Sequence, residues 1–292
     1  MWQFIGKSNL IVVLIVFSVS LYILSKAADY LVDNAVKLSK IWGLSAIIIG
    51  ATIVSFGTTL PELSASVISA LAGHGGFALG NAVGSCITNT SFILGMGALF
   101  GEIPVDKKSS QKLSMLIAAA LLLILPTIPY KIGNQNGLIP QIMGIVFLLL
   151  IPVYTYYSIH QDRKTNSIQN SEEPDNPKGI AFAIVVKIFL FAFITAISAS
   201  ALVASAEDLA ARIGIPDVII SSTLVAFGTS VPELSTCIAA VKNKYGGLAL
   251  GNILGANILN IILVTGASAA LTPNGIIITH IIPSWHYRVN SK

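Results

Sequence analysis

Long apolar runs, each about as long as a membrane is thick, alternate with short polar segments along most of this chain. A run of roughly 20 apolar residues predicts a helix that crosses a membrane. We therefore expect eight spans, at residues 9–30, 45–71, 77–100, 113–130, 138–159, 179–212, 216–241 and 248–271. The alternating segments of about ten residues that are typical of a membrane β-barrel do not occur.

Two of these spans carry the same polar motif. Residues 57–64 read GTTLPELS and residues 228–235 read GTSVPELS. The offset of 171 residues that relates Glu62 to Glu233 also relates Asn89 to Asn260, and about fifty residues align without a gap. A long internal repeat dictates the architecture. Five spans separate the starting points of the copies, so the second copy enters the membrane from the opposite side, which makes an inverted-topology repeat.

The predicted fold is an all-α polytopic membrane protein, an inverted-topology repeat of five-helix units with a shortened second unit. The first repeat is expected at residues 1–160 and the second at 179–292, with a polar linker at 161–178. After the eighth span only residues 276–282 are apolar, and a helix of that length covers about 10 Å. This is too short to cross a core of ~30 Å.

Composition supports a membrane protein. The chain is 54% hydrophobic and 10% charged, whereas soluble domains carry about 25% charged residues. The first apolar run continues into further spans, so we expect a span there and not a cleaved signal. The net charge of +4 comes from loop residues. We therefore expect the lipid bilayer as a partner, and we expect no nucleic acid. The sequence does not indicate an oligomeric state.

The loop charges predict the orientation. Ten Lys and Arg residues follow the odd-numbered spans and five lie on the opposite side. Because cytoplasmic loops carry the excess of Lys and Arg, we expect an N-terminus outside, a cytoplasmic linker and a place in the plasma (inner) membrane.

The motif residues lie on helix faces. Ser55, Thr58, Thr59 and Glu62 follow the i, i+3, i+4, i+7 pattern of one face. In the next span of each copy, further polar residues recur on one face, and pooling these faces would line a single cavity with oxygens; these residues are Asn81, Ser85, Asn89, Asn252 and Asn260.

Each motif also contains a proline. Pro61 and Pro232 have no N–H, so the carbonyls of Gly57 and Gly228 lose their helical partners. A freed carbonyl in apolar surroundings needs another partner. Carboxylates, carbonyls and hydroxyls together suit a hard cation such as Ca²⁺ or Na⁺.

Two other interpretations of the polar residues remain. Glu62 and Glu233 could be protonated structural carboxyls, although a carboxylate costs about 3 kcal/mol to insert and usually has a function. Ser, Thr and Glu also occur in hydrolases, but no His or Lys base is placed near a nucleophile inside the spans. We therefore predict no enzyme and no cofactor, and a site that suits Ca²⁺ or Na⁺.

The paired motifs, with the downstream sequence GNAVGS at residues 80–85, resemble the two alpha repeats of the prokaryotic type of the sodium/calcium exchanger family, in the cation/calcium antiporter superfamily. The resemblance covers nearly the whole chain. It implies ten helices in two inverted halves, with the first and sixth sliding over a core of the second, third, seventh and eighth. It implies an antiporter that exchanges Ca²⁺ for Na⁺ by alternating access.

The resemblance also implies ligands. Glu62 and Glu233 correspond to central ligands shared by Ca²⁺ and Na⁺, and Thr58 and Thr229 to donors of backbone carbonyls. The positions that line the flanking Na⁺ sites are Ser55, Ala226, Thr59 and Ser230, and the polar ligand positions of the third helix are Ser85 and Asn89.

The sequence departs from the family pattern in three ways. Position 260 is Asn where relatives often have Asp, and position 256 is Ala where a hydroxyl is usual. Because only residues 276–282 are apolar after the eighth span, we also expect the last two helices of the family to be absent. The alternatives to Ca²⁺/Na⁺ exchange are therefore Ca²⁺/H⁺ or other cation exchange, or a truncated paralogue that does not transport.

Overall fold

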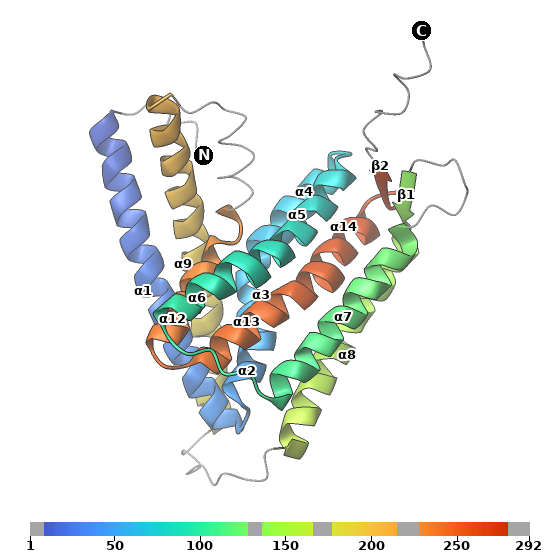
Figure 1. Cartoon of the computed structure of the whole chain (residues 1–292), viewed down its shortest axis with the longest axis horizontal. Coiled ribbons are helices and arrows are strands. Elements are labelled where there is room, and N and C mark those ends of the chain that lie inside the picture. The colour runs from blue at the N-terminus through green and yellow to red at the C-terminus, as the bar shows by residue number, and fades with distance from the viewer. Residues whose placement is uncertain (1–8, 128–135, 166–176, 215–227, 280–292) are drawn as a thin grey trace.

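The computed structural model describes residues 9–127, 136–165, 177–214 and 228–279, and this part of the chain is almost entirely helical (Figure 1). The first half contains α1 (Leu10–Trp42), α2 (Ala46–Ile49), the π-helix η2 (Gly50–Val54), α3 (Ser55–Thr58), α4 (Leu60–Leu71), α5 (Gly75–Thr88), the π-helix η3 (Asn89–Ile93), α6 (Leu94–Phe100), α7 (Lys107–Thr127) and α8 (Gln141–Thr165). The second half contains α9 (Pro177–Arg212), α12 (Val231–Lys242), α13 (Gly246–Leu259), the π-helix η5 (Asn260–Thr265) and α14 (Gly266–Leu271).

The helices confirm most of the predicted spans. Within the described residues, five helices are long and apolar enough to cross a membrane, and there are six if the bent pair 46–58 and 60–71 is counted as one span. They coincide with the predicted spans 9–30, 45–71, 77–100, 138–159, 179–212 and 248–271. The other two predicted spans, 113–130 and 216–241, lie partly outside the described residues. The chain is thus a multi-pass helical membrane protein.

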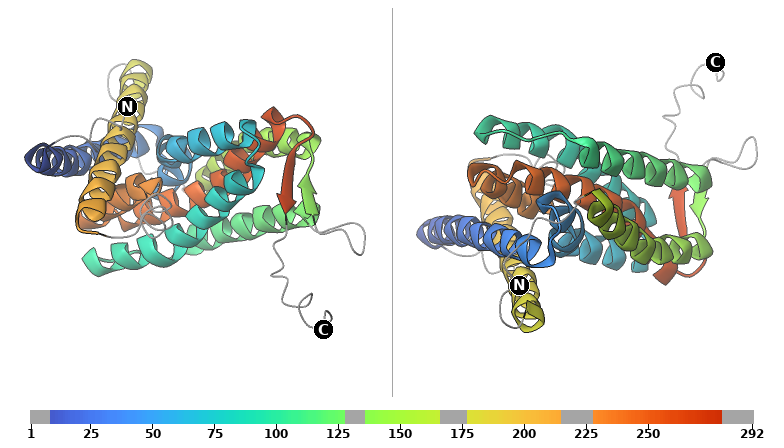
Figure 2. Two further views of the ribbon diagram at one scale, coloured as in Figure 1. Left: turned by 90° about the horizontal axis from the view of Figure 1, so that it is seen from above. Right: turned by 90° about the horizontal axis from the view of Figure 1, so that it is seen from below.

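A short β-ribbon corrects the expectation for residues 276–282. β1 (Asn136–Ile139) pairs with β2 (Ile276–Thr279) as antiparallel strands, with Asn136 opposite Thr279. We expected residues 276–282 to form a short piece of helix. β-branched isoleucines favour extended backbone, and pairing the strands satisfies backbone groups that a single strand would leave open. The ribbon ties the entry of α8 to the segment after α14 (Figure 2).

The helices pack around one central rod. α1 and α9 lie side by side on one flank, and α7 and α8 cover the other (Figure 1). The rod of α13, η5 and α14 runs between them, with α2, η2 and α3 against it. In the most apolar 18-residue stretch of this rod, 94% of the stretch is buried inside the protein. In the equivalent span of the first copy, Gly75–Phe100, the buried share is 22%. The rod is therefore the core on which the other helices pack.

Glycines allow α13 to lie directly against α2 and η2. A Cβ on Gly251 would stand 2.1 Å from the carbonyl oxygen of Ile47, and one on Gly255 would stand 2.5 Å from Cα of Ala51. Gly50 is equally close from the other side, since its Cβ would lie 2.4 Å from the carbonyl oxygen of Leu248. Small residues let membrane helices approach at backbone distance. This contact fixes the two helices that carry polar groups from opposite repeats.

Replacing Gly251 with alanine should therefore push α13 away from α2. We expect Gly251→Ala to lower the unfolding temperature of the purified protein in detergent, since overpacking typically costs about 1–3 kcal/mol. The matched control is Gly247→Ala in the same helix, because nothing lies within 4 Å of a Cβ on Gly247. Equal unfolding temperatures for the two variants would contradict this account of the helix crossing.

Candidate functional site

The first motif lies where a membrane span breaks. η2 and α3 lead into Thr59, and α4 starts at Leu60 with Pro61 in its first turn. The helix axis bends by 46° at this break. Proline is favoured in the first helical turn, where its missing N–H has no role, so it both ends one helix and starts the next. The second copy begins α12 in the same way, with Pro232 in the first turn after Ser230.

The partner span of each copy is also irregular, at equivalent positions. The π-helix η3 begins at Asn89 and the π-helix η5 begins at Asn260, two residues that the offset of 171 relates. A π-helical turn shifts the residues that follow it around the helix and is frequent at functional sites. Both copies thus place an asparagine at the start of a π turn beside the broken helix.

The two motif carboxylates meet in the interior. Glu62 and Glu233 are each 1% exposed, and they lie close enough for their charges to repel. Both carboxylate oxygens of Glu62 and Oε2 of Glu233 have no hydrogen-bond partner among the described residues. Neither Glu takes part in the ion pairs Lys108–Asp162 and Arg212–Asp208. A buried carboxylate without a partner is costly, so this arrangement needs an explanation.

More buried oxygens without partners come from the other predicted site residues. They are Oγ1 of Thr59, Oγ of Ser85, Oδ1 of Asn89, Oγ of Ser230 and Oδ1 of Asn260. Hydroxyls of the opposite repeat lie near the carboxylates, Ser230 near Glu62 and Thr58 near Glu233, and the Ser230 hydroxyl does not reach hydrogen-bonding geometry with Glu62. Ser55 is buried and donates to the carbonyl of Thr52 (3.2 Å), Thr229 is half-buried, and Ala226 lies outside the described residues. The unpartnered oxygens could all accept a cation.

Two hydrogen bonds cross between the repeats in a reciprocal way. The hydroxyl of Thr58 donates to Oδ1 of Asn252 (3.3 Å), and the hydroxyl of Thr229 donates to Oδ1 of Asn81 (3.5 Å). The offset of 171 exchanges the two bonds. This reciprocity is what an inverted repeat produces when its copies meet around an axis in the membrane plane.

Asn257 is a neighbour of the site that the sequence analysis did not identify. Its Oδ1 accepts a hydrogen bond from Nδ2 of Asn89 (2.9 Å), and its own Nδ2 has no partner among the described residues. The residue that corresponds to Asn257 in the first copy is Cys86, so comparing the copies gave no signal. The available signal was a polar residue within the apolar run at 248–271.

α8 supports the helix that leads into the first motif. The hydroxyl of Tyr154 donates to the carbonyl of Ala51 in η2 (2.6 Å). At the end of α8, Asp162 accepts from the backbone N–H and the hydroxyl of Ser45, both at 2.7 Å, and pairs with Lys108 at 2.6 Å. An Asp that accepts from the first backbone N–H groups stabilises a helix start. α8 therefore fixes both ends of the segment from Ser45 to η2.

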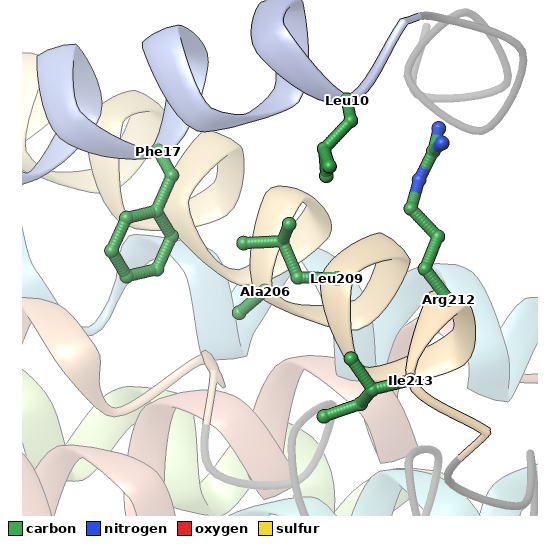
Figure 3. A pocket seen from close by; sticks show the side chains of 6 residues that line it. All are labelled: Leu10, Phe17, Ala206, Leu209, Arg212 and Ile213. Carbon is green, nitrogen blue, oxygen red and sulfur yellow. The ribbon is translucent and has the colours of Figure 1, made fainter.

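A pocket of about 580 Å³ at the outer edge of the α1–α9 pair is a separate feature (Figure 3). Apolar side chains and one arginine line it, namely Leu10, Phe17, Ala206, Leu209, Arg212 and Ile213. Such a lining offers no carboxylate to a cation. It does not include the motif residues.

Among the described residues, no three His, Cys, Asp or Glu side chains gather into a group that could hold a metal ion. Cation binding at the motifs would therefore depend on two carboxylates with hydroxyl, amide and backbone oxygens. Oxygen ligands of this kind suit Ca²⁺ and Na⁺, whereas softer metals prefer imidazole and thiolate.

Comparison with known proteins agrees with the fold and the repeat. A family model described as sodium/calcium exchanger protein matches residues 12–160 and 183–288. The sodium/calcium exchanger MaX1 of Methanosarcina acetivorans is 27% identical over an alignment of 302 positions, gaps included, which covers 89% of this chain and 83% of MaX1. The inner membrane protein YrbG of Escherichia coli is 31% identical over 261 residues, which cover 88% of this chain and 79% of YrbG.

A solved structure gives the same result. The sodium-calcium exchanger NCX_Mj, soaked with 10 mM Na⁺ and zero Ca²⁺, superposes with a TM-score of 0.77 at 28% identity, covering 92% of this chain and 85% of NCX_Mj. Fold, repeat and buried carboxylates define a membrane transporter built from two inverted repeats, and not an enzyme. The chain belongs to the sodium/calcium exchanger family of cation antiporters.

The unpartnered carboxylates make a prediction about stability. We expect Glu62→Gln to raise the unfolding temperature in detergent without Ca²⁺ or Na⁺, because a neutral amide is cheaper to bury than an unpaired charge. Scanning unfolding in a buffer with a chelator and an organic cation would measure this. Glu102→Gln, at an exposed loop carboxylate, is the control and should change nothing. A lower unfolding temperature for Glu62→Gln would show that the carboxylate has an unrecognised partner.

Proposed function

We propose that this protein exchanges Ca²⁺ for Na⁺ across the membrane by alternating access. The observation that carries the proposal is the pair of buried carboxylates, Glu62 and Glu233, with oxygens that have no partner among the described residues. A divalent cation between them would neutralise both charges and fill the unpartnered acceptors. The relatives support the same function, because MaX1 and NCX_Mj are named sodium/calcium exchangers.

The proposed ligands are the motif residues of both repeats. Glu62 and Glu233 would bind either ion, and Thr58 and Thr229 would add backbone carbonyls for Ca²⁺. The remaining proposed positions are Ser55, Thr59, Ser85, Asn89, Ala226, Ser230 and Asn260. The buried oxygens without partners on Thr59, Ser85 and Asn89 support this assignment.

The proposed mechanism is competition for one site. Two carboxylates can be neutralised by one Ca²⁺ or by several Na⁺, and a charged site is expensive to move within a low-dielectric interior. Only a neutralised site would therefore pass between the two open states. The packing of α1 against α9 on one flank supports these two helices as the moving part, with the core around α13 as the fixed part.

We further propose the division of the chain and its placement. Residues 1–160 and 179–292 would be the two repeats, with 161–178 as a cytoplasmic linker. The excess of Lys and Arg on the linker side supports an N-terminus outside, and the inner membrane relative YrbG supports a plasma (inner) membrane location.

Neutralising either carboxylate should abolish exchange. We expect Glu62→Gln and Glu233→Gln each to reduce Na⁺-gradient-driven ⁴⁵Ca²⁺ uptake into proteoliposomes to background, with normal assembly in gel filtration. Glu102→Gln should transport like the unchanged protein. Uptake that persists in either motif variant would overturn the proposed site, and an unchanged protein that takes up no Ca²⁺ under any gradient would indicate a paralogue that does not transport.

Proton coupling is the second candidate, and two residues favour it. Ala256 lacks the hydroxyl that its counterpart Ser85 provides, and Asn260 offers an amide instead of a carboxylate. The first change removes a hydroxyl ligand and the second removes a negative charge, both of which Na⁺ would use, whereas Glu62 and Glu233 could still exchange Ca²⁺ for protons. Imposing a Na⁺ gradient and a pH gradient separately would decide. We expect ⁴⁵Ca²⁺ uptake with the Na⁺ gradient, and uptake driven by the pH gradient alone would establish the proton-coupled alternative.

A further inference from the structure

The reciprocal Thr–Asn bonds join the two halves of the site at its most irregular points. Thr58 closes α3 immediately before the break, and Asn252 lies in the interior of α13, a helix of the other repeat. Asn81 is in α5 and receives the hydroxyl of Thr229, which precedes α12. Asn252 therefore binds Thr58, which lies next to the helix break of the first repeat. Asn81 binds Thr229, which lies next to the start of α12 in the second repeat.

The two asparagine amides are not held equally. Nδ2 of Asn81 donates to Oγ of Ser66 (3.0 Å) and reaches the carbonyl of Glu62 (3.5 Å), so both ends of this amide are used. Nδ2 of Asn252 is buried and has no partner among the described residues. The amide of Asn81 is thus fixed at both ends and that of Asn252 at one.

One substitution between the copies accounts for this difference. The residue that corresponds to Ser66 is Cys237. The Ser66 hydroxyl donates to the carbonyl of Ala78 and accepts from Asn81, whereas Sγ of Cys237 is directed to the carbonyl of Ile93 (3.8 Å). Sulfur is a weak acceptor, so the second copy lacks the group that would hold its asparagine.

We propose that Asn81 and Asn252 are positioning residues of the ion site, which act through the hydroxyls of Thr229 and Thr58, and that the Asn252 arm is the looser one. The proposal rests on the function proposed above. Neither asparagine needs to touch the ion. Each sets the orientation of a threonine that lies next to a helix break.

Competition for the Thr58 hydrogen makes the Asn252 arm important. The Thr58 hydroxyl lies 3.4 Å from the carbonyl of Ser55 and 3.3 Å from Oδ1 of Asn252, and it also interacts with Glu233. A hydroxyl has one hydrogen to donate. Asn252 therefore competes with Ser55 and Glu233 for the Thr58 hydrogen, and its removal leaves Thr58 to these two acceptors.

The test is a pair of double-mutant cycles read as the half-saturating Ca²⁺ concentration of ⁴⁵Ca²⁺ uptake in proteoliposomes. Thr58→Val removes the hydroxyl and keeps the backbone carbonyl. We expect Asn252→Ala and Thr58→Val each to raise half-saturation about fivefold, as expected for the loss of one hydrogen bond. The double variant should be no worse than the more severe single variant, because the bond between Thr58 and Asn252 is already lost in each of them. Asn81→Ala with Thr229→Val should behave in the same way.

A mismatched pair provides the control. Asn252→Ala combined with Thr229→Val removes two different bonds, so the two increases should multiply. Multiplying effects in the matched pairs would overturn the positioning role and would leave the proposed exchange intact. An unchanged protein that transports no Ca²⁺ under a Na⁺ or a pH gradient would instead overturn the proposed function. If Asn252→Ala does not assemble, Asn252→Ser, which is too short to reach Thr58, takes its place in the cycle.

Ser66→Cys tests the unequal arms directly, because it gives the first copy the residue of the second. We expect a two- to fivefold increase in half-saturating Ca²⁺, with no change in the maximal rate. In an Asn81→Ala background the same substitution should have no effect, since the amide that Ser66 holds is gone. An equal increase in both backgrounds would show that Ser66 acts through packing and would contradict the unequal arms.

Discussion

Two carboxylates, buried together without a cationic partner among the described residues, are the constraint on which this structure depends. Insertion scales place a charged residue at about 3 kcal/mol in the middle of a membrane, and two such charges that repel each other cost more. Glu62 and Glu233 are nevertheless almost completely buried and keep oxygens without partners. The surrounding helices must hold these groups in place, since water and lipid both favour moving them apart.

Backbone-level packing supplies that restraint. The contact of α13 with α2 and η2 leaves no room for a Cβ at Gly50, Gly251 or Gly255, so the two helices cannot slide without lifting apart. Tyr154 and Asp162 then fix the segment before the first motif from α8. These contacts lie outside the site, and they determine where its oxygens stand. Packing at this density resists small displacements and transmits larger ones.

The sequence was sufficient for six of the eight predicted spans, the repeat and the buried motif faces, because a membrane imposes length and apolarity on each helix locally. It was not sufficient where the outcome depends on distant partners. Pairing of β1 with β2 joins segments about 140 residues apart, and nothing in the isoleucines of 276–279 identifies the other strand. Asn257 escaped notice because its counterpart is Cys86. The exposure of equivalent residues also differs, since Ile87 is 61% exposed and Ile258 is 2% exposed, depending on which helices lie outside.

Differences between the copies are as informative as their similarity. The carboxylates and the proline breaks are the same in both, but Ser85 and Ser66 of the first copy correspond to Ala256 and Cys237 of the second. Hydroxyl groups are therefore concentrated on one side of the site. With an amide at position 260, the formal charge of the motif residues is that of the two glutamates alone. One divalent or two monovalent cations neutralise it, and a third monovalent ion would leave a net positive charge that low-dielectric surroundings penalise. At the proposed site, the substitutions would thus act on the balance between ions, while the two carboxylates supply the negative charge that a bound cation would neutralise.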